Sequence, residues 1–218
     1  MIRIKICGLS RACDIEAANR CRPDYAGFVF AKSRRQVTPR EAAELRRLLD
    51  PGILPVGVFV NAPVSQMERL VKDGVIDAIQ LHGQEEEDVI RTLQRDLGCP
   101  VIKAFSVRSA LDLQRAAGSC ADYVLLDYGA GGTGHSFDWR LLEETPLNRP
   151  WFLAGGISPE NALEAAQTGA WALDVSSGVE TDGKKDPEKM SGIVRRIRNG
   201  ERQIRHIRGT VHPGNIDE

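Results

Sequence analysis

Short apolar segments alternate with amphipathic segments eight times along this chain, and this repeat limits the possible folds more than any other feature. The apolar segments are four to seven residues long and most are rich in Val, Ile, Leu and Phe, as expected of buried strands. The predicted strands are Ile2–Cys7, Tyr25–Phe30, Leu54–Val60, Ala78–Leu81, Val101–Phe105, Tyr123–Asp127, Trp151–Ala154 and Ala172–Val175.

The intervening segments interleave charged and apolar residues at helical spacing. In two of them an N-cap residue precedes proline at the first helical position, at Thr38-Pro39 and Ser158-Pro159. The predicted helices are Arg11–Arg20, Pro39–Leu49, Val64–Val71, Glu86–Leu97, Ala110–Ala117, Trp139–Glu144, Pro159–Thr168 and Pro187–Ile197.

Eight strand–helix units at a period of roughly 25 residues match the size of an α/β fold with a closed parallel sheet, the (βα)8 or TIM barrel. A doubly wound open sheet is the structural alternative. We predict a single barrel domain over residues 1–199 and a C-terminal tail of unknown role over residues 200–218. The Arg-Gly and Pro-Gly steps of that tail are typical of a mobile or surface-bound segment.

Composition limits the partners of the chain. Lys and Arg number 29 against 30 Asp and Glu, so the net charge of -1 favours neither nucleic acid nor an anionic membrane surface. The sequence has no signal-peptide core and no apolar run of about 18 residues, so we expect a soluble cytoplasmic protein. The five cysteines are odd in number and lack Cys-x-x-Cys spacing, which argues against disulfides and a metal site.

Alternation along the first strand separates its side chains into two faces. Three isoleucines share one face, and Arg3, Lys5 and Cys7 share the other. If the isoleucines face the helices, the cations point into the barrel and each needs a counter-charge. The first and eighth strands are neighbours in a closed barrel, so we predict an ion pair between Asp174 and either Lys5 or Arg3.

Two loops of small residues follow the seventh and eighth predicted strands. Gly155 and Gly156 lie in the first, and Ser176, Ser177 and Gly178 lie in the second. Backbone amides can approach an anion closely in such loops, and barrels commonly bind phosphate at this place. The alternative is two tight turns that need glycine for positive φ angles.

Eight motifs follow one another in the order found in phosphoribosylanthranilate isomerase, which this chain resembles from residue 1 to about residue 199. They are Lys5-Ile6-Cys7-Gly8, Gly27-Phe28-Val29-Phe30, Val56-Gly57-Val58-Phe59-Val60-Asn61, Gln80-Leu81-His82-Gly83, Leu125-Leu126-Asp127, Gly131-Gly132-Thr133-Gly134 with Phe137-Asp138-Trp139, Ala154-Gly155-Gly156-Ile157-Ser158-Pro159-Glu160-Asn161 and Asp174-Val175-Ser176-Ser177-Gly178-Val179-Glu180.

The resemblance implies an enzyme of tryptophan biosynthesis. Such enzymes convert N-(5-phosphoribosyl)anthranilate to 1-(2-carboxyphenylamino)-1-deoxyribulose 5-phosphate by an Amadori rearrangement, without a metal or an organic cofactor. The small phosphorylated substrate would be the only partner besides a second copy of the chain, since relatives are monomers or homodimers. The family's general base matches Cys7 and its general acid matches Asp127.

The surroundings of both groups would have to shift their pKa values toward neutral pH. An inward-facing Lys5 near Cys7 would lower the pKa of the thiol, which is otherwise about 8.5. Asp127 must keep a proton near neutral pH, which requires burial or a neighbouring anion. The alternatives are an inert buried thiol and a carboxylate that merely caps a helix or loop.

The anthranilate carboxylate needs its own receptor, and the family pattern matches Arg35 better than Arg34, although a solvated basic loop is the other interpretation. Gln80, His82 and Gly132 are further candidates to line the site, together with Lys5 and Asp174. A lone histidine at a strand end is more often a structural hydrogen-bonding residue than a catalytic one.

Two departures from the family pattern are the short segment Tyr128–Ala130 and the tail, which contains His206 and His212. Two other ribose-phosphate barrels are rival interpretations. The aminoaldose isomerase of histidine biosynthesis would have an aspartate where Cys7 stands, and indole-glycerol-phosphate synthase would use lysines and glutamates at several strand ends. A noncatalytic phosphate-binding barrel would not need both Cys7 and Asp127.

Overall fold

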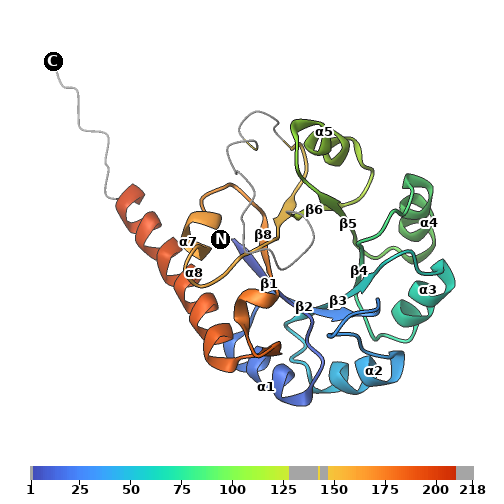
Figure 1. Ribbon diagram of the computed structural model, residues 1–218, viewed down its shortest axis with the longest axis horizontal. Helices are drawn as coiled ribbons and strands as arrows, with labels where there is room; N and C mark the ends of the chain where they lie inside the picture. Colours follow the sequence, from blue (N-terminus) through green and yellow to red (C-terminus); the bar gives the residue numbers. More distant parts are fainter. Residues whose placement is uncertain (1, 128–141, 143–146, 210–218) are drawn as a thin grey trace.

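The chain forms a closed barrel of eight parallel strands, so the predicted TIM barrel is confirmed and the open sheet is excluded. The computed structural model describes residues 2–127, 142 and 147–209, with side chains as far as residue 200. Strands follow one another around the barrel in chain order, inside a ring of helices (Figure 1). They are β1 (Arg3–Cys7), β2 (Tyr25–Val29), β3 (Leu54–Phe59), β4 (Ala78–Leu81), β5 (Val101–Ser106), β6 (Tyr123–Asp127), β7 (Trp151–Leu153) and β8 (Ala172–Val175).

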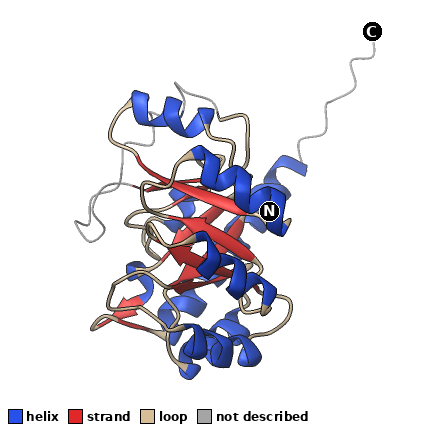
Figure 2. Cartoon of the chain, turned by 90° about the vertical axis from the view of Figure 1, so that its right-hand side faces the viewer, coloured by secondary structure: helices blue, strands red, loops and turns tan. Residues whose placement is uncertain are grey.

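Helices cover the outside of the sheet, as the side view in Figure 2 shows. The predicted helix 139–144 lies outside the described residues except for Leu142, which is helical. A short hairpin, β9 (Glu180–Thr181) and β10 (Lys184–Lys185), follows the 3-10 helix η1 (Ser177–Val179). The helices are α1 (Ala12–Cys21), α2 (Pro39–Leu48), α3 (Val64–Lys72), α4 (Glu87–Leu97), α5 (Ala110–Gly118), α7 (Ala162–Ala165) and α8 (Pro187–Gly209).

Side chains pack in two layers, as the alternation along the strands predicts. Ile4 and Ile6 are fully buried in the large layer between the sheet and the helices. A smaller layer fills the inside of the barrel, which is therefore a packed core and not a pore. The buried members of the inner layer are Val56, Ala78, Ile102, Ala104, Leu125, Phe152, Ala154 and Ala172.

Of the two predicted helix starts, one is confirmed and the other is wrong. Thr38 caps α2 and exchanges hydrogen bonds with Glu41 in a capping box, with Pro39 at the first helical position. The helix predicted from Pro159 is reduced to the single turn of α7. Asn161 prevents an earlier start, because its side chain accepts from the backbone N–H of Ser158 and donates to the carbonyl of Gly156, both at 2.9 Å.

The last helix is attached to the first strand. Arg198 on α8 donates to the carbonyl of Ile2 at 3.1 Å and to Asp24 Oδ2 at 2.6 Å. The same carboxylate oxygen accepts from the backbone N–H of Ile4 at 2.8 Å. Helix α8 continues beyond residue 199 to Gly209, while residues 210–218 lie outside the described part, so the division into barrel and tail stays a prediction.

No helix in the described part of the chain combines the length and the apolarity needed to cross a membrane.

Replacing Asp24 tests this attachment between the two ends of the barrel. Asp24→Ala removes an acceptor shared by a guanidinium and a strand amide, so the free energy of unfolding should fall by about 2 kcal/mol, measured by urea denaturation. The control is Glu44→Ala, which breaks a pair with Arg40 whose side chains are 56% and 90% exposed. It should leave the unfolding midpoint unchanged, and equal effects of the two variants would contradict the prediction.

Candidate active site

A cavity of about 410 Å³ lies at the carboxyl end of the barrel, where barrels of this kind carry their sites. Lys5 and Gly178 are not part of its lining, and Gly132 lies outside the described residues. The predicted site residues that line the cavity are Cys7, Arg35, Gln80, His82, Asp127, Gly155, Gly156, Asp174, Ser176 and Ser177.

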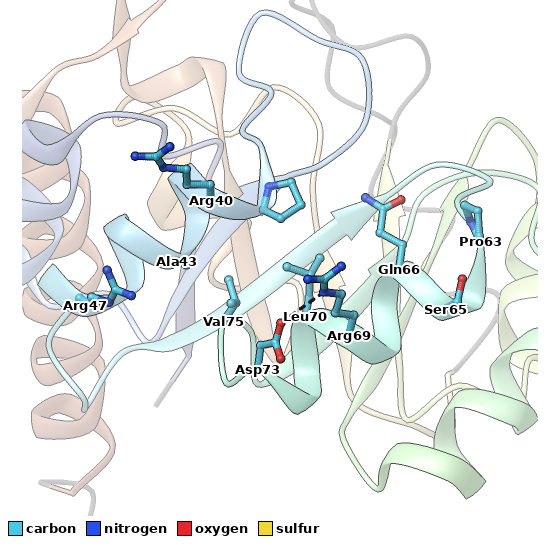
Figure 3. Close-up of a pocket in the computed structure, with 11 residues that line it drawn as sticks. Arg40, Ala43, Arg47, Pro63, Ser65, Gln66, Arg69, Leu70, Asp73 and Val75 are labelled. Carbon is cyan, nitrogen blue, oxygen red and sulfur yellow. Dashed lines mark ion pairs between the residues drawn. The ribbon is translucent and has the colours of Figure 1, made fainter.

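A larger cavity of about 870 Å³ lies in the helical layer between α2 and α3 (Figure 3). Three arginines, Arg40, Arg47 and Arg69, surround an apolar floor that includes Leu70. Its lining contains neither cysteine nor histidine, and Arg69 is paired with Asp73. We place the site at the barrel mouth because acid–base groups gather there, although the outer cavity is larger.

The predicted ion pair at the seam of the barrel is confirmed, with Lys5 as the cation. Lys5 Nζ lies 3.0 and 3.1 Å from the two carboxylate oxygens of Asp174, its register partner on β8. Burial opposes the charge on fully enclosed Lys5, but Asp174 and Cys7 together outweigh burial, and the pKa of Lys5 is raised. Arg3 is not the partner, because its guanidinium stacks 3.6 Å from the centre of the Trp171 ring.

Cys7 is buried at the end of β1, and Gly27 on β2 leaves room for its sulfur. A Cβ at position 27 would lie 2.8 Å from Cys7 Sγ. Lys5 lowers the pKa of the Cys7 thiol, as expected, but that pKa is raised overall. Burial raises that pKa more than Lys5 lowers it, and Asp174 raises it further, so Cys7 is a neutral thiol at neutral pH.

Asp127 and His82 face one another across the mouth of the barrel. Asp127 Oδ2 lies 3.4 Å from His82 Nε2, with the two side chains 20% and 35% exposed. Gln80, which is 1% exposed, has its side-chain nitrogen 2.9 Å from His82 Nδ1. The histidine therefore lies beside the carboxyl group that the sequence singles out.

Arg35 makes a bidentate ion pair that its sequence context does not reveal. Its Nε and Nη2 lie 2.6 and 2.8 Å from the two carboxylate oxygens of Glu180. Lys185 Nζ is 2.6 Å from the same carboxylate and 2.9 Å from the carbonyl of Ser176. The arginine stem crosses Gly8, where any Cβ would overlap with it.

Glu180 and Lys185 hold two cavity-lining residues, Arg35 and Ser176, and the sequence analysis did not identify either of them. Burial by itself raises the pKa of Glu180, but the hydrogen bonds from Arg35 and Lys185 outweigh it and lower that pKa to about 2. Burial also lowers the pKa of Lys185, although Glu180 partly offsets this. The only sequence signal was that Glu180 ends the motif beginning at Asp174, since its partner Arg35 is 145 residues away.

The two small-residue loops meet at the same rim. Gly155 and Gly156 have φ angles of +87° and +67°, so both turns need glycine. Their backbone N–H groups have no hydrogen-bond partner within the described chain. Gly178 is required for another reason, because a Cβ there would overlap with the carbonyl oxygen of Ile157 in the neighbouring loop.

Within the described residues, no group of three or more His, Cys, Asp and Glu side chains is placed to hold a metal ion.

Residues 4–196 match the family model described as N-(5'-phosphoribosyl)anthranilate (PRA) isomerase. A Streptococcus gordonii protein of that name is 39% identical over 201 residues, which are 92% of this chain and 100% of the relative. A Streptococcus pneumoniae relative is 43% identical over 202 residues, covering 92% and 98% of the two chains. The chain belongs to the PRA isomerase family. It is an enzyme, an isomerase of tryptophan biosynthesis.

Solved PRA isomerases have the same fold. The Thermus thermophilus structure has a TM-score of 0.82 at 33% identity and covers 91% of this chain and 99% of its own. Another PRA isomerase, with a TM-score of 0.81 at 32% identity over 91% and 100% of the chains, is in complex with reduced 1-(o-carboxyphenylamino)-1-deoxyribulose 5-phosphate. The Thermotoga maritima enzyme, at 33% identity and a TM-score of 0.82 over 91% and 100%, is described as dimeric, with monomers generated from it.

Separating the two small-residue loops should impair substrate binding. Gly178→Ala places a methyl group against the backbone of Ile157, so one loop must shift and KM in the PRA isomerase assay should rise at least about tenfold. Gly192→Ala is the control, because a Cβ at this α8 position meets nothing within 4 Å. The control should keep its KM and be slightly more stable. An unchanged KM in Gly178→Ala would mean that the close approach is irrelevant to binding.

The charge on Glu180 should contribute to stability in a predictable pH range. Its folded pKa of about 2 lies below the ordinary value of 4.5, so the stabilisation is complete above pH 4.5 and is lost as pH falls toward 2. Glu180→Gln should be less stable than wild type by about 2 kcal/mol at neutral pH, and this difference should shrink below pH 4.5. Urea unfolding at several pH values measures both quantities, and a difference independent of pH would contradict the assignment.

Proposed function

We propose that this chain isomerises N-(5-phosphoribosyl)anthranilate with Cys7 as general base and Asp127 as general acid. One observation carries the proposal. A single cavity at the carboxyl rim of the barrel is lined by a thiol, a carboxyl group, an arginine and two small-residue loops. These are the groups required by a substrate that has a phosphate at one end, an aromatic carboxylate at the other and a ribose between them.

The reaction begins when the ring of the ribose opens. The carboxyl O–H bond of Asp127 breaks and its proton moves to the ring oxygen, while the bond from that oxygen to the anomeric carbon breaks with its electron pair going to oxygen. The nitrogen lone pair forms the C=N bond of the resulting iminium. A neutral carboxyl group suits this step because it is a proton donor, and Asp127 lines the cavity at the carboxyl end of its strand.

Cys7 completes the rearrangement by removing a proton from the carbon next to the iminium. The C–H electrons form the C=C bond of an enolamine, the C=N π electrons return to nitrogen, and the enolamine tautomerises to the aminoketose. Since burial raises the pKa of Cys7, the reactive thiolate is a minor species at neutral pH. Lys5 and Lys185 both act in the opposite direction and lower the free energy needed to form it.

The two ends of the substrate have separate receptors in this proposal. The N–H groups of Gly155 and Gly156, which have no hydrogen-bond partner among the described residues, suit the phosphate, with the Ser176–Gly178 loop beside them. Arg35 suits the anthranilate carboxylate, because Glu180 holds its guanidinium in one orientation at the cavity wall. A complex of a related enzyme with a reduced form of the product, which carries both a phosphate and a carboxyphenyl group, supports this substrate class.

Removing either reacting group should abolish most turnover. Cys7→Ala and Asp127→Asn should each lower kcat at least about a hundredfold, as expected when a general base or acid is lost. The assay follows freshly generated PRA, with binding of a product analogue measured in parallel to show that the variants retain the site. Matched controls are Cys13→Ala, which alters an exposed thiol on α1, and Asp88→Asn, whose side chain is 95% exposed on α4. Wild-type turnover in either active-site variant would overturn the role proposed for that residue.

A further inference from the structure

A backbone hydrogen bond to a neighbouring strand or loop holds each of His82 and Asp127 at the mouth of the barrel. The N–H of His82 donates to the carbonyl of Phe59 at 2.8 Å, and the carbonyl of Asp127 accepts from the N–H of Val107 at 2.8 Å. Strand β5 lies between β4 and β6, and Leu81 pairs with Lys103, so the next β5 residue, Ala104, stands opposite His82. Because Ala104 is small, the imidazole can reach the carboxyl group across this strand.

Gln80 determines which nitrogen of His82 carries the proton. Its side-chain amide donates to His82 Nδ1, so the neutral imidazole has its proton on Nε2, the nitrogen that faces Asp127. This tautomer follows from the hydrogen-bond network. Gln80 Oε1 is buried and has no hydrogen-bond partner within the described residues. After a half-turn of the amide, that oxygen would accept from an Nδ1–H, so Gln80 can serve both protonation states of the ring.

We propose that His82 and Asp127 share one proton and together form the general acid, with His82 as the proton reservoir and Gln80 as its positioning residue. The inference rests on the function proposed above for Asp127. Among the described residues, His82 is the titratable side chain in contact with the carboxyl group of Asp127, at 3.4 Å.

The transfer is a simple proton exchange. When the pair holds the shared proton, the ring is an imidazolium whose Nε2–H faces the carboxylate, and the turned Gln80 amide accepts from its Nδ1–H through Oε1. When substrate expels water from the cavity, the low dielectric disfavours the separated charges and favours the neutral pair. The Nε2–H bond then breaks with its electron pair remaining on nitrogen, and a carboxyl O–H bond forms on Asp127. Asp127 can now donate to the ring oxygen, and nothing is oxidised or reduced.

The other charged groups that line the cavity do not compete for this role. Lys32, Arg34 and Arg35 come from the loop after β2, Asp174 is neutralised by its ion pair with Lys5, and burial keeps Cys7 as a thiol. The strands on either side of β4 bring no further charge to the cavity, since Lys103 on β5 points outward and pairs with Glu85. Among the described residues that line this cavity, only His82 is of a type that ordinarily changes charge between about pH 5 and 8.

The test compares pH profiles of kcat and KM in wild type and His82→Asn, a variant that keeps a polar amide but cannot hold a proton. We expect kcat at about pH 7.5 to fall at least about tenfold with KM changed less than about threefold. The limb on which kcat falls with rising pH should move to lower pH by at least about one unit. His206→Asn, on the outer helix α8, is the matched control and should keep the wild-type profile.

Imidazole ¹⁵N NMR gives a readout that does not depend on activity. The His82 signals are assigned by their loss in His82→Asn. In wild type the neutral ring should be the Nε2–H tautomer, and Asp127→Asn should lower the titration midpoint of His82 by at least about half a unit. Gln80→Leu should give a mixture of tautomers. A similar tautomer and midpoint in all three proteins would exclude the shared proton.

The outcomes separate this inference from the function on which it rests. If Cys7→Ala and Asp127→Asn lose turnover but His82→Asn keeps the wild-type pH profile, Asp127 acts alone and the shared proton is wrong. If Asp127→Asn retains turnover, Asp127 is not the general acid, and the shared proton is excluded together with that role. Thermal unfolding of each variant shows whether a loss of activity reflects the site or the fold.

Discussion

Lys5 and Asp174 place two opposite charges inside the barrel at the seam between its first and last strands, and the active-site mouth is built above them. Either charge alone would be strongly destabilising in this position, since removing one partner of a buried pair costs about 3–5 kcal/mol. Their register pairing lets each neutralise the other where the sheet closes. It also sets the electrostatics at Cys7, because the lysine lowers the pKa of the thiol while its own counter-ion raises it.

Above this seam a second charge cluster connects loops that are distant in sequence. Glu180 lies between Arg35 and Lys185, and Lys185 also donates to the carbonyl of Ser176. The cluster therefore attaches the loop after β2 to the loop after β8, on either side of the end of β1. A guanidinium held in this way loses less conformational entropy when it binds a carboxylate than a free one would. This arrangement would let Arg35 act as a rigid receptor in the function proposed for it.

Local signals predicted most of the fold because strands and helices depend on residues close in sequence. All eight predicted strands are present, and the Thr38-Pro39 start is correct because a capping box needs only four neighbouring residues. Ser158-Pro159 has the same form, but the Asn161 side chain accepts a hydrogen bond from the backbone N–H of Ser158, and this contact holds Ser158 in a loop. In that case a competing contact decided the local structure. Likewise, the hydrophobic pattern of the last helix did not predict that α8 continues past residue 199.

The sequence by itself determined the eightfold alternation, the inward face of β1 and the thiol and carboxyl group at two strand ends. Each of these follows from periodicity or residue type, which short-range geometry controls. Only the tertiary structure decided that Lys5 and not Arg3 pairs with Asp174, that burial outweighs Lys5 at Cys7, and that His82 lies beside Asp127. Coulombic interaction and desolvation depend on distance and exposure in space, and the folded barrel creates both by bringing separate strand ends to one rim.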